Sequence, residues 1–239
     1  MLKVFKPSLF AITGLLLFYS FAFSGEFLLK QFLFDDQKDL NSWKEMVLDG
    51  KVDYFIEIKD ENGFVHALSE NACSAIYHRV GYKPVNFPVL TWKWSVLKFP
   101  EKDPANPVDD YAARIYAIFP SISFSTSKFI EYIWAEDLPE GHIQQSPSAK
   151  NIMQIVVRSG RDNAGKWFEE KRNIYDDYEL VFGKKAKTSV GAIAIMCNSN
   201  ITKSTAECLV DNIKIEKLSE PGTESPGTGS QEVQSDNDE

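Results

Sequence analysis

Ten short apolar and aromatic runs, separated by turn-forming residues, constrain the fold of this chain more than any other feature. In residues 89–96, large apolar side chains such as Trp92 and Trp94 alternate with mostly polar neighbours, which is the period of a strand with one buried face. Asn62-Gly63 separates two of the runs and predicts a β-hairpin. The ten predicted strands are residues 52–59, 64–68, 74–80, 89–96, 110–119, 129–135, 152–158, 166–172, 190–197 and 207–216. This pattern predicts an all-β, mainly antiparallel fold, and specifically a jelly-roll β-sandwich.

One helix is expected to interrupt the strands. Asn173 is a favourable N-cap, and Gly183 stands where a helix commonly ends on a left-handed residue. Between them, apolar residues recur at helical spacing and give one buried face. These residues are Ile174, Tyr178, Val181 and Phe182. A second short helix or turn is expected within residues 36–47. Its predicted buried side consists of Leu40, Trp43 and Val47.

The first 24 residues have the three parts of a secretory signal peptide. Lys3 and Lys6 form a positive start, residues 9–23 form an apolar middle, and small residues precede a cut after Ser24. The apolar run is shorter than the roughly 20 residues that a membrane-spanning helix requires. We therefore expect a bacterial protein that is exported to the periplasm or the extracellular space, with no membrane span once residues 1–24 are removed.

The C-terminal segment, residues 219–239, contains six acidic residues, no basic residue and a single valine. Such a composition cannot bury enough apolar surface to offset its ordering entropy, so a disordered acidic tail is expected. Residues 25–218 then form a single β-sandwich domain. The formal net charge is −8, and the sequence has no basic block or stripe, so nucleic acid is not an expected partner. The oligomeric state is left open.

Three cysteines are present, and export would permit a disulfide between two of them. Cys197 closes one apolar run and Cys208 opens the next, so a hairpin would bring the two together. A Cys197–Cys208 bridge and three buried free thiols, Cys73 included, both fit this pattern. No Cys-x-x-Cys spacing supports a zinc or redox site.

Ten short segments, in a fixed order, carry a family resemblance. They are residues 90–94, 109–116, 132–135, 157–160, 165–167, 170–173, 177–178, 182–183, 193–196 and 211–213. Together they resemble an exported bacterial domain of unknown function, family 3047, over about residues 31–216. Members of that family tend to carry aspartates after the segment at 193–196, where this chain has Asn198 and Asn200. The resemblance implies no activity, and this departure implies that any cation or acid–base role of that loop is lost or weakened.

A looser resemblance rests on the last predicted strand. Residues 209–215 are similar to the closing strand of galactose-binding-like jelly rolls and other carbohydrate-binding modules. The resemblance implies a fold, and a fold does not determine function.

The first candidate site is a polar group around Arg114. Asp110, Arg114 and Tyr116 share one face of the predicted strand because side chains alternate. Arg114 lies among aromatic and apolar residues, so its charge requires a partner. The candidate partners are Asp110, Glu170 and Asp177. The group is either a polar anchor inside a binding groove or a structural ion pair.

The second candidate site is a set of aromatic side chains. Tyr132 and Trp134 share a strand face, Trp94 lies on another strand, and Trp167 stands beside the turn at Gly165. Sugar rings stack on such side chains while nearby polar groups hold the hydroxyls. Packing between two sheets would use the same aromatic residues. Trp167 is expected to be the most exposed of the four.

The third candidate is a group of charges around Glu169, Glu170 and Arg172. A glycoside hydrolase needs two carboxyl groups about 5–10 Å apart. Glu169 and Glu170 point to opposite faces of a strand and cannot form that pair, so Glu170 would have to act with Asp110 or Asp177. The alternative is a solvated rim beside the helix.

The leading hypothesis is a non-catalytic exported β-sandwich that binds a glycan or another envelope ligand. The predicted ligand-binding residues are Asp110, Arg114, Tyr132, Trp134, Trp167, Glu170 and Arg172. An envelope polysaccharide hydrolase with paired carboxylates and a structural or protein-interaction module are the alternatives. No catalytic residue, cofactor or metal ligand is predicted, because the three histidines lack metal-ligand spacing and no phosphate or dinucleotide motif is present.

Overall fold

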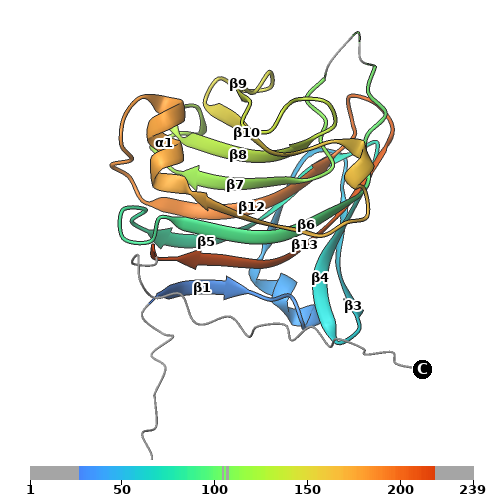
Figure 1. Cartoon of the computed structure of the whole chain (residues 1–239), viewed down its shortest axis with the longest axis horizontal. Coiled ribbons are helices and arrows are strands. Elements are labelled where there is room, and N and C mark those ends of the chain that lie inside the picture. Colours follow the sequence, from blue (N-terminus) through green and yellow to red (C-terminus); the bar gives the residue numbers. More distant parts are fainter. Residues whose placement is uncertain (1–26, 104, 106–107, 219–239) are drawn as a thin grey trace, which may run out of the picture.

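Two packed β-sheets form the protein (Figure 1). The computed structural model describes residues 27–103, 105 and 108–218; the predicted signal peptide and acidic tail lie outside these residues. The strands of the first sheet are β1 (Leu28–Phe32), β3 (Asp53–Lys59), β4 (Asn62–Glu70), β6 (Val89–Lys98), β11 (Phe168–Asn173) and β13 (Thr205–Glu216). The strands of the second sheet are β2 (Lys44–Asp49), β5 (Cys73–Tyr82), β7 (Arg114–Phe119), β8 (Lys128–Ala135), β9 (Ile143–Gln145), β10 (Ile152–Ser159) and β12 (Val190–Asn198).

The strand order confirms the predicted mainly antiparallel jelly-roll sandwich. The first sheet runs β11-β6-β13-β4-β3, with β1 also paired to β13, and the second runs β2-β5-β12-β7-β8-β10-β9. Among the described strands, only β8 and β10 pair in parallel. Within the same residues, no helix has the length and apolar character needed to cross a membrane.

Aromatic side chains fill the space between the two sheets. Trp92 and Trp94 of β6 are both fully buried, as are Tyr132 and Trp134 of β8 in the opposite sheet. The ring centroids of Trp92 and Tyr132 lie 5.2 Å apart, and those of Trp94 and Trp134 lie 5.9 Å apart. Alternation along β6 therefore points its large side chains into the core, as the sequence predicts.

The helix α1 (Ile174–Phe182) has the predicted bounds and caps, and it lies at one end of the sandwich (Figure 1). The Asn173 side chain accepts hydrogen bonds from the backbone N–H groups of Tyr175 and Asp176. Gly183 ends the helix in the left-handed region, with φ of 69°. Three short 3-10 helices complete the secondary structure of the described residues. They are η2 (Gln37–Ser42), η3 (Phe124–Thr126) and η4 (Arg161–Asn163).

The hairpin between β3 and β4 is confirmed, but its turn lies earlier than predicted. Asp60 and Glu61 form the two-residue turn, with φ of 52° and 65°. Gly63 belongs to β4, and a Cβ atom there would lie 2.7 Å from the Cα atom of Asp35 and would also meet the Phe34 carbonyl. The turn does not require Gly63. A glycine is needed there because the backbone of residues 34–35 packs directly against β4 and leaves no room for a side chain.

Several predicted boundaries in the first half of the chain are wrong. The strand expected at 110–119 begins only at Arg114, so Asp110 lies in the preceding loop. Residues 36–47 contain η2 and then strand β2, and Val47 is exposed rather than buried. Strands β1, β2 and β9 have no alternating apolar pattern, because they are edge elements with few buried side chains.

The predicted hairpin of β12 and β13 is also wrong. Strand β12 pairs with β5 and β7, whereas β13 pairs with β1, β4 and β6 in the other sheet. Cys197 and Cys208 are both buried free thiols. Burial and the neighbouring Cys208 thiol raise the pKa of Cys197. The Cys197–Cys208 bridge is not formed in this structure and stays a prediction.

The two ends of the described chain lie side by side. Strand β1 pairs antiparallel with the end of β13, and Leu28 stands opposite Glu216. The backbone N–H of Lys217 donates to the Phe27 carbonyl at 2.8 Å.

Candidate functional site

Arg114 belongs to a buried, closed network of charges. It donates to Glu131 at 2.6 Å and to Asp109 at 3.3 Å, and both carboxylates are buried. The prediction that Arg114 pairs with Asp110, Glu170 or Asp177 is therefore wrong. Burial opposes the ionisation of Asp109, but Arg114 and three further donors outweigh it and lower the pKa of Asp109. Those donors are Ser146, Ser148 and Gln154.

Asp110 joins the loop before β7 to the connection between β12 and β13. Its carboxylate accepts from the Asn198 amide at 2.6 Å and from the Thr202 backbone N–H at 2.7 Å. The Thr202 hydroxyl donates to the same carboxylate at 2.8 Å. An aspartate at position 198 would repel Asp110, so the amide that departs from the family pattern has a structural role here.

The other predicted ligand residues in the sandwich are also engaged within the fold. The Tyr132 hydroxyl donates to Asp177 at 2.8 Å, and Arg172 donates to the same carboxylate at 3.0 Å, which holds α1 against β8 and β11. Glu170 accepts from the Trp94 indole at 3.2 Å and from Arg158 at 2.9 Å. The Trp134 indole donates to a backbone carbonyl and is fully buried. Six of the seven predicted residues thus have partners within the protein.

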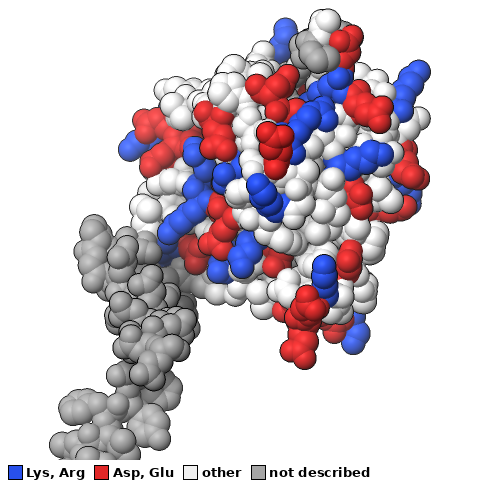
Figure 2. Space-filling model, turned by 45° about the vertical axis from the view of Figure 1, so that its right-hand side comes forward, with Lys and Arg blue, Asp and Glu red and all other residues white. Residues whose placement is uncertain are grey.

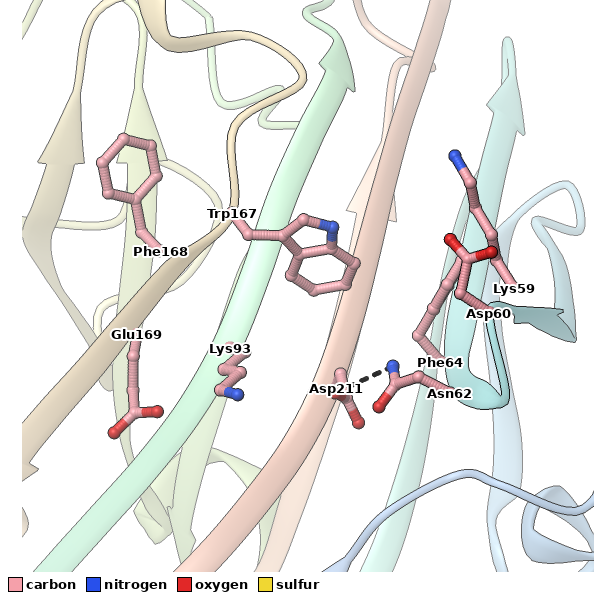
Figure 3. A pocket seen from close by; sticks show the side chains of 9 residues that line it. All are labelled: Lys59, Asp60, Asn62, Phe64, Lys93, Trp167, Phe168, Glu169 and Asp211. Carbon is pink, nitrogen blue, oxygen red and sulfur yellow. Dashed lines mark hydrogen bonds between the residues drawn. The ribbon is translucent and has the colours of Figure 1, made fainter. Parts of the chain in front are cut away.

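Trp167 is the predicted residue that opens to the surface, with 41% of its area exposed. It borders a hollow of about 590 Å³ on the outer face of the first sheet (Figure 3). The hollow is lined by Lys59, Asp60, Asn62, Phe64, Lys93, Trp167, Phe168, Glu169 and Asp211. The expectation that Trp167 is the most exposed of the four candidate aromatics is confirmed.

Strand register brings the polar residues of the hollow into one row. Glu169 of β11 stands opposite Lys93 of β6, and Lys93 stands opposite Asp211 of β13. The row therefore alternates in charge across three neighbouring strands. Trp167 lies two residues before Glu169, and in Figure 3 its indole extends across β6 toward β13, beside the row. Its ring meets Phe64 of β4 edge to face, with centroids 5.5 Å apart.

Asp211 is the most unusual group in the hollow. The residue is 5% exposed, and its Oδ1 atom is buried without a hydrogen-bond partner among the described residues. Its Oδ2 atom accepts from Asn62 at 3.4 Å, as the dashed line in Figure 3 shows. Burial raises the pKa of Asp211, although Asn62 and Lys93 oppose the shift. A buried carboxylate oxygen without a donor is costly, which agrees with the raised pKa.

Sequence reasoning missed Asp211, Lys93 and Asn62. Asp211 lies in the last apolar run, where the alternation predicts a strand but does not tell which neighbours lie beside it. On the face drawn in Figure 2, basic and acidic side chains are interspersed, so charge patterning marks no site there either. The one available signal was the turn at Gly165, whose N–H donates to the Val96 carbonyl at 2.8 Å and so fixes Trp167 beside β6.

A second polar cleft lies among the loops at one end of the sandwich. Lys102 donates to Glu136 at 2.8 Å and lies 3.7 Å from the Tyr111 ring centroid. Burial raises the pKa of Glu136, although Lys102 opposes the shift. Asp109 also lines this cleft, but both of its oxygens are engaged by the Arg114 network. Asp103, Asp137 and Asp162 line the same cleft, so it holds further carboxylates besides Glu136.

Comparison with known proteins gives one family match. The family model described as "Protein of unknown function (DUF3047)" matches residues 41–214. The search of curated proteins found no matching relative.

Solved structures of several kinds have a loosely similar outline. One is the family 11 carbohydrate-binding module of the cellulosomal cellulase Lic26A-Cel5E of Clostridium thermocellum, with 11% identity and a TM-score of 0.42 over 74% of this chain and 88% of that one. Another is the xyloglucanase domain of NopAA from Sinorhizobium fredii, with 11% identity and a TM-score of 0.40 over 73% of this chain and 93% of that one. A third is the K1 cleaved adhesin domain of Lys-gingipain from Porphyromonas gingivalis, with 16% identity and a TM-score of 0.36 over 74% of this chain and 92% of that one. The function has to come from this chain's own residues.

Proposed function

The chain belongs to the DUF3047 family of proteins of unknown function, and we propose that it is an exported, non-catalytic β-sandwich protein that binds a saccharide in the hollow beside Trp167. The observation that carries the proposal is the half-exposed indole of Trp167 beside a row of polar side chains. The N-terminal pattern of residues 1–24 supports export, and so a glycan of the envelope or its surroundings as the ligand.

The hollow combines the two elements that saccharide recognition needs. The indole of Trp167 offers an apolar face on which a sugar ring can stack. Beside it, Asp211 and Glu169 can accept hydrogen bonds from hydroxyl groups, while Lys93 and Asn62 can donate them.

The charges of the hollow favour a neutral ligand. Its lining includes the basic residues Lys59 and Lys93 and the acidic residues Asp60, Glu169 and Asp211. Because both signs are interleaved, neither a polyanion nor a polycation would find a uniform field. A neutral polyhydroxylated ligand can use donors and acceptors together.

The spacing of the acidic residues favours binding over hydrolysis. Glu169 and Asp211 lie on strands separated by β6, so their backbones are two strand spacings, about 10 Å, apart. Glycosidases hold their two carboxyl groups roughly 5–9.5 Å apart, so this pair would meet the requirement only if both side chains leaned toward each other across β6. The cation of Lys93 also stands between them.

A glycan array followed by titration calorimetry tests the proposal. We expect one class of neutral glycan to bind the mature protein, and Trp167→Ala to weaken that binding at least about tenfold, as loss of a central aromatic contact does. Phe55→Ala is the matched control, because Phe55 lies on the same sheet with 42% exposure but outside the hollow. Absence of binding at millimolar concentration, or equal effects of the two variants, would refute the proposal. Release of reducing ends from the bound glycan would instead favour the hydrolase.

A further inference from the structure

The outer face of the second sheet is apolar where a sandwich normally presents polar side chains. Antiparallel sheets with one solvated face usually alternate apolar and polar residues. Along β12, however, the outward positions are Ala192, Ala194 and Met196, and along the adjacent β7 they include Tyr116 and Ile118. These strands are thus apolar on both faces, which is typical of a surface that something covers.

This face is hollowed into a trough of about 320 Å³. Strands β5 and β12 contribute Ala75, Ala192 and Ala194, whose short side chains form the floor of the trough. Larger side chains border it, with Leu48 of β2 on one flank and Phe129 of β8 on the other. All the lining side chains are uncharged, and the volume lies at the lower end of the roughly 300–1,000 Å³ of small-molecule pockets.

Two cations lie at one end of the trough. Lys44 is on the same face of β2 as Leu48, because side chains alternate along a strand. Arg79 is likewise on the same face of β5 as Ala75. Lys44 stands opposite Tyr77, two residues before Arg79, so the two cations are near neighbours, and both are exposed. The acidic Glu45 is engaged on the opposite face, with the Ser74 hydroxyl.

From this arrangement we infer that the trough binds a free fatty acid. The alkyl chain lies over Ala75, Ala192 and Ala194, and the carboxylate lies between Lys44 and Arg79. An uncharged apolar trough that ends in two cations is complementary to an anion with a single long apolar tail. A bilayer surface would require a flat or convex face and a second copy would require a self-complementary one, whereas the floor of alanines accommodates one alkyl chain. The site lies on the sheet opposite the Trp167 hollow, so the two proposals are independent.

Displacement of a fluorescent probe tests the inference. Dansyl-labelled undecanoate is bound to the mature protein and displaced with dodecanoate or with dodecyltrimethylammonium, which has the same chain and a cationic head. We expect dodecanoate to displace the probe at least about tenfold more effectively, because Lys44 and Arg79 attract only the anion. Failure of dodecanoate to displace it, or equal displacement by the two amphiphiles, would overturn the inference.

A pair of exposed leucines provides matched variants. Leu48→Glu places a charge in the wall of the trough, whereas Leu180→Glu places one on α1; the two leucines are 60% and 63% exposed, so neither change should disturb the core. We expect probe affinity to fall at least about tenfold in the first variant, because the alkyl chain would meet a charge, and to be unchanged in the second. Equal affinities would contradict the inference.

Two further measurements would show whether a membrane surface or a second copy of the chain covers the trough instead. Sedimentation with anionic phospholipid vesicles, in the absence of dodecanoate binding, would replace the fatty acid by a membrane surface. A dimer in sedimentation velocity that Leu48→Glu dissociates and dodecanoate does not would replace it by a second copy. Trp167→Ala should leave probe binding unchanged, which separates this site from the proposed saccharide site.

Discussion

Replacement of Arg114 by methionine should destabilise the protein strongly, because it would leave two buried carboxylates without their cation. Glu131 lies 2.6 Å and Asp109 lies 3.3 Å from the Arg114 guanidinium, and Arg114 itself is only 2% exposed. Removing one partner from such a buried group typically costs about 3–5 kcal/mol. Gln154 still donates to both carboxylates, at 2.8 Å and 3.1 Å, so we expect the lower part of that range, about 3 kcal/mol.

Urea unfolding followed by tryptophan fluorescence measures this loss, since Trp92, Trp94 and Trp134 are buried in the core and become exposed on unfolding. With a urea dependence of about 2 kcal/mol per molar, the midpoint of Arg114→Met should fall by roughly 1.5 M. Arg79→Met, at an exposed position, should change the free energy of unfolding by no more than about 0.5 kcal/mol.

Acidification should reduce the loss in Arg114→Met. Burial raises the pKa of Glu131 even in the presence of Arg114, and removing the cation raises it further. The folded variant then binds a proton at a higher pH than the unfolded chain, so its stability increases as the pH falls through the pKa of the folded state. Two buried unpaired charges should cost about 3 kcal/mol at neutral pH. A measured loss of stability below about 1 kcal/mol would refute this reasoning and restore Arg114 as a ligand anchor.

Two further changes test other parts of the structure. Asp211→Asn should stabilise the protein by about 1 kcal/mol at neutral pH, because it removes the negative charge of a buried carboxylate and keeps an oxygen that can accept from Asn62. Since the pKa of Asp211 is raised in the folded state, the wild-type protein should lose stability as the pH rises through that pKa, and thermal unfolding at several pH values should show a flatter profile for the variant. Gly63→Ala should cost more than about 2 kcal/mol, because its Cβ atom would meet the backbone at Phe34 and Asp35; an unchanged melting temperature would show that this contact is not rigid.

The sequence predicted the architecture well because alternation and capping are local signals. Strand β6 and helix α1 follow directly from residues 89–96 and from the caps at Asn173 and Gly183. The exposed edge strand β2 was missed, since its residues Lys44–Asp49 bury no side chain that would leave an alternating pattern.

The candidate site was harder to predict because it depends on strand register. Glu131 was not considered as the partner of Arg114, since only the pairing of β7 with β8 places it there. The row of Glu169, Lys93 and Asp211 likewise exists only once three strands are aligned. The aromatic residues Tyr132 and Trp134 could not be assigned to core or surface, because stacking on a sugar and packing between sheets use the same side chains.

The pairing of β1 with the end of β13 determines how the protein should respond to tension. Because Leu28 stands opposite Glu216, the two ends of the described chain leave the sheet at the same point. A force that pulls these ends apart would load the β1–β13 ladder one hydrogen bond at a time, as in a zipper, rather than all of them together in shear. Strand β1 should therefore peel away at low force while β13 keeps its pairings with β4 and β6. A protein held at both ends would therefore lengthen by the residues of β1 while the other strands of both sheets stayed paired.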